Sequence, residues 1–316
     1  MIWGVYKTKS GLQTATELER LALVEATQLV WIDLYNATPQ ERDWVEMHVG
    51  VELFTRQEAE EIESSSKYFE NAGEVNANST YIYHKDGVYA TDPVSFILKN
   101  TLLITQRNIE LRSFDEVLRF FRLGKKPDVN GSNILLSLFE TRIDIEADFL
   151  EELSRKIHAT SKRMTLSDTL DKDVLIEINQ QQELTILFRQ TTSEMQRLIS
   201  ALLKSDSFPK DEYEKLRVII KDAGSLLEHT SFNFERLESL QNTFLGLVDM
   251  EQNRVIKIFT VVTVGFMPPT LIASLYGMNF ELMPELNWAL GYPFAILLMI
   301  LSSAMTLLYF KRQKWL

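Results

Sequence analysis

Two long uncharged stretches near the C-terminus constrain the fold of this chain most strongly. They are residues 258–280 and 286–310, of 23 and 25 residues, within the last 60 of 316 residues. About 20 apolar residues suffice for a helix to cross the roughly 30 Å hydrocarbon core of a bilayer. Helices buried in a globular core rarely run so far without a charge, so we expect two transmembrane helices.

The charges that flank these stretches predict how the chain is oriented. Arg254 and Lys257 precede the first stretch, and the basic residues Lys311, Arg312 and Lys314 follow the second. The only charged side chains in the loop between them are acidic, Glu281 and Glu285. By the positive-inside rule both termini are cytoplasmic and the loop lies outside. The N-terminal MIWGVYKTKSGLQ has no apolar signal-peptide core, so we expect a multi-pass protein of the cell (inner) membrane.

Charge and cysteine content exclude several classes of partner. The formal net charge is −11, from 33 basic and 44 acidic residues, which argues against a nucleic-acid partner. An acidic domain beside a membrane instead raises the local concentration of cations. The chain has no cysteine, which excludes disulfides and thiolate metal sites. The partners we expect are therefore lipid bilayer and divalent cations.

The first 130 residues mix strand-like and helical patterns and predict a small α/β domain. Strand-like runs are residues 29–34, 79–84, 94–99 and 101–106, the last two forming a hairpin that turns at Lys99-Asn100. Thr38 as cap, Pro39 at the first position and Gly50 as stop predict a helix. Residues 57–69 form a second helical patch. No Gly-rich phosphate loop supports nucleotide binding here.

From residue 133 the pattern is helical. Residues 133–203 predict an antiparallel helical hairpin with a break at 164–168. The apolar stripe of its second helix turns polar in the middle, at Gln181 and Thr185, so we expect loose packing there. A third helical pattern runs from Lys210 to Tyr276, and its 67 residues would span about 100 Å.

These patterns give the fold class and the domain boundaries. We expect a membrane protein of α+β class with an N-terminal cytoplasmic α/β domain, a long helical stalk and two C-terminal transmembrane helices. The predicted segments are an α/β domain (1–130), a helical hairpin (131–204), a stalk helix (205–257), a first span (258–279), an outer loop (280–291), a second span (292–310) and a basic cytoplasmic tail (311–316).

Polar side chains follow one face of the first span. The members of this polar stripe, spaced three and four residues apart, are Asn253, Ile256, Thr260, Thr263, Met267, Thr270 and Ser274. Small polar residues permit close packing between membrane helices. Alternatively, the stripe lines an aqueous path, which requires several copies around an axis because one helix encloses nothing. Pro268 and Pro269 leave the carbonyls of Val264 and Gly265 without intrahelical donors, and water in such a path could satisfy them.

The triplet Gly277-Met278-Asn279 stands at the outer end of the polar stripe. Glycine is a common helix stop because it reaches left-handed dihedrals cheaply, and a cap is one interpretation of Gly277. In an oligomer, the triplet would instead place a ring of Asn279 carboxamides at a pore mouth. Neutral amide oxygens can hydrogen-bond a hydrated Mg²⁺ without trapping it.

The stretch YGMNF (residues 276–280), followed by MPEL (283–286) and the ending YFKRQKWL, resembles the CorA family of magnesium channels. The similarity is close over residues 251–316 and extends to AEEIESSSKYFE at residues 59–70. This resemblance implies a homopentameric funnel that imports Mg²⁺, also passes Co²⁺ or Ni²⁺, and is gated by cytoplasmic Mg²⁺, with no organic cofactor.

The resemblance also assigns roles to residues. It implies a selectivity filter at Gly277, Met278 and Asn279, with Asn279 contacting hydrated Mg²⁺. By this resemblance Asn253, Met267 and Thr270 would line the pore, joined by Thr260, Thr263 and Ser274 of the polar stripe, and Ile256 and Phe259 would form a hydrophobic gate. Lys257, Lys311, Arg312 and Lys314 would form a basic collar. No motif places the regulatory carboxylates; Asp249 and Glu251 are candidates.

Two other functions stay open at this point. One is the related zinc-type transporter, which typically replaces the methionine of the triplet, so Met278 disfavours it. The other is a membrane-anchored scaffold or sensor that transports nothing. An enzyme has little support, because His48, His84, His158 and His229 are scattered without metal-ligand spacing and no nucleophile motif appears.

Overall fold

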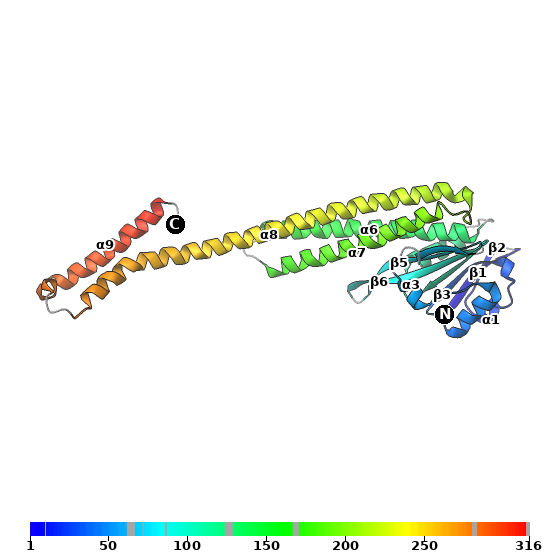
Figure 1. Cartoon of the computed structure of the whole chain (residues 1–316), viewed down its shortest axis with the longest axis horizontal. Helices are drawn as coiled ribbons and strands as arrows, with labels where there is room; N and C mark the ends of the chain where they lie inside the picture. The colour runs from blue at the N-terminus through cyan, green and yellow to red at the C-terminus, as the bar shows by residue number, and fades with distance from the viewer. Residues whose placement is uncertain are drawn as a thin grey trace. The chain divides into compact units, whose positions relative to one another are not determined.

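The structure is a computed structural model that describes residues 1–9, 11–61, 67–71, 73–85, 87–123, 129–166, 171–279 and 283–313. Two compact units divide the chain (Figure 1). One comprises Met1–Ser167 with Asp171–Leu240, and the other contains Gln241–Leu316.

A seven-stranded sheet forms the centre of the first unit. Its strands are β1 (Ile2–Thr8), β2 (Gly11–Ala15), β3 (Leu29–Tyr35), β4 (Tyr68–Asn71), β5 (Glu74–Lys85), β6 (Val88–Lys99) and β7 (Leu102–Arg107), in the order β2-β1-β3-β7-β6-β5-β4. Only β3 and β7 pair in parallel among these strands. The predicted strands are confirmed, and the β6–β7 hairpin turns at Lys99-Asn100, where Asn100 has φ 53°.

Helices cover both faces of the sheet. They are α1 (Leu18–Leu21), η1 (Ala26–Gln28), α2 (Pro39–Val45), η2 (Glu46–Gly50), α3 (Arg56–Glu60) and α5 (Arg112–Leu123). Alternate strand residues such as Ile32 and Ile104 pack with Leu21 and Phe54 in one buried cluster. On the other face, Trp31 lies 5.9 Å, ring to ring, from Phe114 of α5. The buried alternation on both faces is what a sheet between two helical layers requires.

The predicted start of α2 is confirmed in detail. Thr38 and Glu41 form a reciprocal capping box, with Pro39 in the first turn. The predicted stop at Gly50 is also confirmed, since Gly50 has φ +71°. The predicted helical patch at 57–69 is partly wrong: α3 ends at Glu60, and Tyr68 begins strand β4. Pairing with β5 outweighs the local helical pattern there, and residues 62–66 lie outside the described residues.

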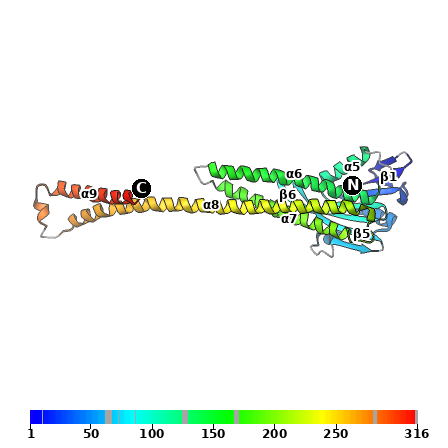
Figure 2. The ribbon, with the colours of Figure 1, turned by 90° about the horizontal axis from the view of Figure 1, so that it is seen from above.

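Three long helices complete the first unit. They are α6 (Gly131–Leu166), α7 (Lys172–Leu202) and the first part of α8 (Tyr213–Tyr276), which follows η3 (Lys210–Glu212). They run side by side in two views (Figures 1 and 2). The hairpin of α6 and α7 is confirmed, although α6 continues to Leu166, past the start of the predicted break. Gly131 begins α6 where any Cβ would stand 2.5 Å from the backbone nitrogen of Leu103.

Buried charges tie α6 and α7 to the sheet. Arg142 of α6 donates to Glu146 Oε1 at 2.7 Å, to the Ser79 hydroxyl at 2.8 Å and to the Thr80 carbonyl at 2.9 Å. Thr192 of α7 donates to the second oxygen of Glu146 at 3.1 Å. A charge removed from water in this way requires such complete pairing.

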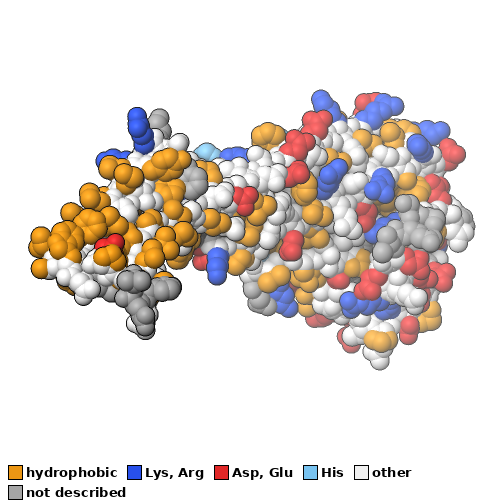
Figure 3. Space-filling model, turned by 60° about the vertical axis from the view of Figure 1, so that its left-hand side comes forward, with side chains coloured by type: hydrophobic (Ala, Val, Ile, Leu, Met, Phe, Trp, Pro, Cys, Tyr) orange, Lys and Arg blue, Asp and Glu red, His pale blue; other side chains and the backbone are white. Residues whose placement is uncertain are grey.

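The second unit consists mainly of two apolar helices. The C-terminal part of α8 runs to Tyr276, and α9 extends from Gly291 to Arg312, after the short η4 (Pro284–Asn287). Both helices are long and apolar enough to cross a membrane. Hydrophobic side chains dominate their surface in Figure 3. Little of this surface is buried in the chain, which is what a helix in contact with lipid requires.

Candidate functional site

One face of α8 packs against α9. Val261 is 5% exposed, and Gly265 is buried next to Leu307. On α9 the buried or half-buried positions recur on one face: Gly291, Ala295, Met299, Ser302, Ser303, Thr306 and Phe310. Ser302 and Thr306 donate to their own backbone carbonyls, at 2.8 and 2.9 Å. Small residues with satisfied hydroxyls let two membrane helices approach closely, and the structure gives that role to α9.

The polar stripe lies on the other face of α8. Its members stand two, five, nine and twelve residues from Gly265, which places them about 120–200° around the helix from that residue. Asn253, Ile256, Thr263, Met267, Thr270 and Ser274 are exposed, and Thr260 is half-buried. The contact with α9 therefore leaves the stripe uncovered within one chain. Within one chain the stripe therefore does not serve to pack α8 against α9, and its two predicted roles, packing between copies and lining an aqueous path, both stay predictions.

Hydroxyl groups of the stripe keep acceptor capacity. Thr260 donates to the Ile256 carbonyl and Thr270 to the Phe266 carbonyl, each at 2.8 Å. A threonine oxygen has two lone pairs beside its one hydrogen. Once the hydrogen is used on the backbone, the oxygen can only accept. The water molecules around a metal ion point their hydrogens outward, so such oxygens suit a hydrated cation.

The triplet follows directly after the end of α8. The Gly277 N–H donates to the Ala273 carbonyl at 3.0 Å and the Met278 N–H to the Leu275 carbonyl at 3.3 Å, and Gly277, Met278 and Asn279 are exposed. The expected left-handed cap is wrong, because Gly277 has no positive φ. The helix instead ends in a tighter turn, and a Cβ on Gly277 would stand 3.2 Å from the Ala273 oxygen. Glycine fits here by its size.

A short, hydrogen-bonded turn immediately precedes α9. Trp288 N–H donates to the Glu285 carbonyl, and Gly291 N–H donates to the Trp288 carbonyl at 2.9 Å. A Cβ on Gly291 would lie 2.2 Å from the Glu285 carbonyl oxygen, closer than any side chain allows. Trp288 packs on Phe294 with 5.7 Å between ring centroids. These contacts fix the backbone on which the exposed Glu285 stands.

The predicted gate and collar residues lie at different places on the two helices. Ile256 is 53% and Phe259 69% exposed. Ile256 belongs to the polar stripe, and Phe259 lies about 60° to one side of it. Lys257 is half-buried, and Lys311 and Arg312 are exposed in the last turn of α9. Lys314 lies outside the described residues.

The candidate regulatory carboxylates do not form a metal site within one chain. Asp249 and Glu251 are exposed and two residues apart on α8, so they point to opposite sides of the helix. Glu251 lies 3.6 Å from Arg254. Among the described residues, no group of three His, Cys, Asp or Glu could hold a metal ion.

Sequence reasoning missed two features of the first unit. The charge network around Arg142 was not predicted, because an arginine within an apolar helical stripe only indicates an interruption of the pattern. A pocket of about 900 Å³ between α6 and α7 was signalled only indirectly, by the polar centre of the α7 stripe at Gln181.

These observations define a class: a membrane protein with two spans, an α/β unit and a polar face on its first span that its second span leaves uncovered. The chain belongs to the CorA-like Mg2+ transporter protein family, whose sequence profile matches residues 26–312.

Relatives extend over the whole chain. The magnesium transport protein CorA of Wolinella succinogenes is 34% identical over 99% of both chains, and that of Pectobacterium atrosepticum is 36% identical over 95% of this chain and 96% of its own. The solved CorA magnesium transporter of Methanocaldococcus jannaschii covers 100% of this chain and 99% of its own, with a TM-score of 0.86 at 18% identity. At that identity the structural likeness supports the fold alone.

Proposed function

We propose that this protein is a passive channel that imports Mg²⁺, driven by the membrane potential, with Co²⁺ and Ni²⁺ as further cargo. The observation that carries the proposal is the polar stripe of α8, which faces away from α9 and ends at Gly277-Met278-Asn279. The relatives named as magnesium transport proteins support the choice of ion.

A pore of this kind requires several copies of the chain. One stripe cannot enclose a path, whereas five first spans around an axis can turn their stripes inward and their α9-packed faces outward. Closed cyclic assemblies are the usual symmetry of homo-oligomers. We therefore propose a homopentamer in the cell (inner) membrane, with both termini in the cytoplasm and the triplet at the outer mouth.

The chemistry of the mouth suits an ion that keeps its water. Mg²⁺ loses its hydration shell reluctantly and favours oxygen ligands. A ring of Asn279 amide oxygens would accept hydrogen bonds from the ion's water molecules, and the threonine oxygens of the stripe would continue this contact along the path. Neutral acceptors bind weakly enough for release, which conduction needs.

Exposed apolar side chains can close the same path. Ile256 and Phe259 would stand around the axis of a pentamer, and a ring of such side chains gates by excluding water. Cytoplasmic Mg²⁺ would control the gate by binding carboxylates of neighbouring subunits, for which Asp249 and Glu251 are candidates. Lys257, Lys311, Arg312 and Lys314 would form a basic collar near the cytoplasmic end.

The membrane potential provides enough driving force. A divalent ion that crosses 100 mV, negative inside, gains about 4.6 kcal/mol, twice the roughly 2.3 kcal/mol of a single charge. No nucleotide hydrolysis is required.

Flux into proteoliposomes tests the proposal. Vesicles that contain a Mg²⁺ indicator should show uptake that rises with an inside-negative potential, and Asn279→Ala should reduce it strongly. Asn287→Ala, the same change at an exposed position in η4, is the matched control and should leave uptake intact. Uptake that survives Asn279→Ala would falsify the filter, and preference for Zn²⁺ over Mg²⁺ would indicate a zinc-type transporter.

The mass of the particle in detergent provides a second test. Five chains of 36.6 kDa give about 183 kDa before bound detergent. A monomer without flux would instead indicate a membrane-anchored scaffold or sensor.

A further inference from the structure

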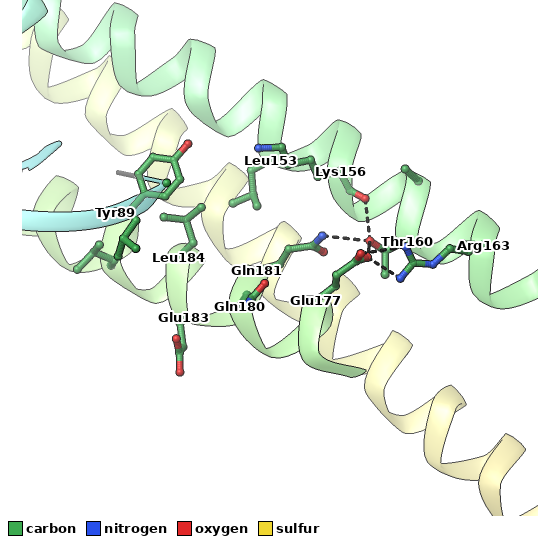
Figure 4. Close-up of a pocket in the computed structure, with 14 residues that line it drawn as sticks. Tyr89, Leu153, Lys156, Thr160, Arg163, Glu177, Gln180, Gln181, Glu183 and Leu184 are labelled. Atoms are coloured by element: carbon green, nitrogen blue, oxygen red, sulfur yellow. Dashed lines mark hydrogen bonds and ion pairs between the residues drawn. The ribbon is translucent and has the colours of Figure 1, made fainter. Parts of the chain in front are cut away.

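A hollow at the edge of the sheet has no part in the proposed pore. It lies between α7 and the strands β4 and β5, has a volume of about 280 Å³, and its described lining residues all belong to the first unit. This volume is just below the range typical of drug-sized ligands, so it suits a small one. The larger hollow between α6 and α7 offers less, because Lys156 and Arg163 are already paired with carboxylates and the Glu183 side chain points away from it (Figure 4).

One face of α7 forms a wall of this edge hollow. The lining residues of α7 are Gln190, Glu194, Arg197, Leu198 and Ala201. Their spacing places them within about 100° of one another around the helix, so they face the same space. The opposite wall consists of Tyr68 of β4, Asn78 of β5 and Lys67, which directly precedes β4.

Asn78 is the residue that points to a ligand. Its side chain lines the hollow and is 1% exposed, and neither Nδ2 nor Oδ1 has a hydrogen-bond partner among the described residues. A buried amide without partners is unfavourable, so it gains from any guest that supplies them. Because no hydrogen bond holds the carboxamide, it can turn toward the hollow. A guest with a donor next to an acceptor would then pair with both of its atoms.

The carboxylates at the hollow are already used. Glu194 accepts from Lys67 Nζ at 2.6 Å on one oxygen and from the Thr80 N–H at 2.7 Å on the other. Glu70, next to the lining residue Tyr68, accepts from the Tyr68 hydroxyl at 2.6 Å and from a serine hydroxyl on its second oxygen. A cation that enters would therefore find no free carboxylate among the described residues at this place.

The cations, by contrast, keep free donors. Lys67 uses one ammonium hydrogen on Glu194 and one on the Thr80 hydroxyl, at 3.2 Å, which leaves the third. Arg197 donates to the Ser193 hydroxyl at 3.2 Å and forms no ion pair with the described residues. The hollow therefore offers an anion two cationic donors beside the unpartnered Asn78 amide.

We propose that this hollow binds the hydrogen phosphate ion. Its charged oxygens accept from Arg197 and from the remaining ammonium hydrogen of Lys67, and such charge-assisted hydrogen bonds are the stronger kind. Its P–OH group donates to Asn78 Oδ1, while Asn78 Nδ2 donates to a neighbouring phosphate oxygen. Sulfate and the phosphodiester of a lipid headgroup lack the P–OH hydrogen at neutral pH, so neither can donate to Asn78. This site is independent of the transport function proposed above.

Three oxyanions test the site. Phosphate, sulfate and dimethyl phosphate, as sodium salts, are titrated by calorimetry into the full-length protein in dodecyl maltoside at pH 7, at constant ionic strength and without divalent cations. Phosphate should bind at least about tenfold more tightly than either of the others, because it alone donates to Asn78. Sulfate that binds as tightly would make the hollow a nonspecific anion site, and dimethyl phosphate that does so would assign it to lipid headgroups. Either result would overturn the proposal, as would a lack of binding by phosphate.

Charge variants of α7 locate the binding. Arg197→Gln should weaken phosphate binding by about two- to fivefold, since an exposed charge contributes modestly. Arg189→Gln makes the same charge change at an exposed α7 residue outside the hollow and should have no effect. Equal affinities in the two variants would place the phosphate elsewhere.

A variant of Asn78 tests the amide itself. Asn78→Leu should weaken phosphate binding at least about tenfold, while its melting temperature without phosphate stays the same or rises, because a buried amide without partners is removed. Phosphate should raise the melting temperature of the wild type and leave that of Asn78→Leu unchanged. Full affinity in Asn78→Leu would contradict the proposal, and the exposed Arg197 decides the question if Asn78→Leu does not fold. Because binding and melting alone are measured, every result leaves the transport proposal untouched.

Discussion

Gly265 of α8 lies against Leu307 of α9, with 3.7 Å between Leu307 Cδ2 and the place where a Cβ on Gly265 would stand. This distance is an ordinary van der Waals contact, so one methyl group fits and a branched side chain does not. We expect Gly265→Ala to be neutral or to stabilise by up to about 1 kcal/mol, the difference in helix propensity. Gly265→Leu should separate the helices and lower the melting temperature in detergent. An unchanged melting temperature in Gly265→Leu would mean that the two spans do not pack at this point.

Isosteric changes distinguish the polar stripe from the packing face. Thr263→Val removes a hydroxyl from the stripe, and Thr306→Val removes one from the face of α9 that packs on α8. If the stripe lines the path of a hydrated ion, Thr263→Val should reduce Mg²⁺ uptake by at least about twofold, because acceptors on the path are lost. Thr306→Val should keep the uptake rate. Equal rates in both variants would remove Thr263 from the conducting path.

The turn before α9 should tolerate no side chain at Gly291. A Cβ there overlaps the Glu285 carbonyl, so Gly291→Ala must shift the backbone. We expect a loss of about 1–3 kcal/mol, typical of local backbone strain, together with reduced uptake. Gly246→Ala is the control, since nothing lies within 4 Å of its added Cβ. A Gly291→Ala protein that is as stable and as active as the control would contradict the geometry of this turn.

Removing Arg142 should destabilise the first unit strongly. Arg142→Leu leaves the buried Glu146 without its cation, which typically costs about 3–5 kcal/mol. The double variant Arg142→Leu/Glu146→Leu removes both charges and should recover much of that loss. Chemical denaturation followed by circular dichroism measures both. A double variant less stable than the single one would show that the hydrogen bonds of Glu146, and not the unpaired charge, dominate.

The free energy of unfolding at neutral pH should rise when Asp144, a carboxylate with other carboxylates nearby, is neutralised. Desolvation by the surrounding protein and the nearby Asp148, Asp222 and Glu116 raise the pKa of the exposed Asp144 above 3.8. A raised pKa means that the folded state prefers the protonated form, so its contribution to stability is present below pH 3.8 and is lost as the pH rises through the folded pKa. Asp144→Asn should therefore stabilise by up to about 0.5 kcal/mol at pH 7.

The pH dependence is the control for that prediction. Thermal unfolding should show the advantage of Asp144→Asn at pH 7 and a much smaller one at pH 3.5, where the wild-type carboxyl is mostly protonated. Asp43→Asn makes the same charge change on α2. An equal gain from both variants would point to the net charge of −11 as the cause, rather than to the neighbours of Asp144.

Local signals in the sequence were sufficient for much of the fold. The capping box at Thr38, the hairpin turn at Asn100 and the two uncharged stretches each rest on residues close together in the chain. The failure at Tyr68–Asn71 has a different cause, because this strand exists only through its pairing with β5. Sheet order escaped prediction for the same reason, since the parallel contact of β3 with β7 joins residues some 70 positions apart.

The candidate site, like the fold, could be predicted only in part. A three-four spacing on one helix was enough to define the polar stripe, but not to say which face α9 covers. That depends on Gly265 and Val261, which look like ordinary span residues in the sequence. Gly277 was correctly predicted to end the helix, but the left-handed conformation predicted for it is wrong. A sequence motif does not determine the backbone dihedral angles of its residues. The roles of the individual stripe and triplet residues stay predictions.

The residues of the first unit all precede the second unit's apolar helices in the order of synthesis. The parallel pairing of β3 with β7 is complete once Arg107 has been made, and Gly131 can then dock on β7. Domains generally fold as units from the N-terminus during synthesis. The sheet with its helices can therefore reach its final state before either apolar helix leaves the ribosome. A folding defect in the first unit would then arise while the two apolar helices are still outside the bilayer, so it precedes insertion and does not depend on it.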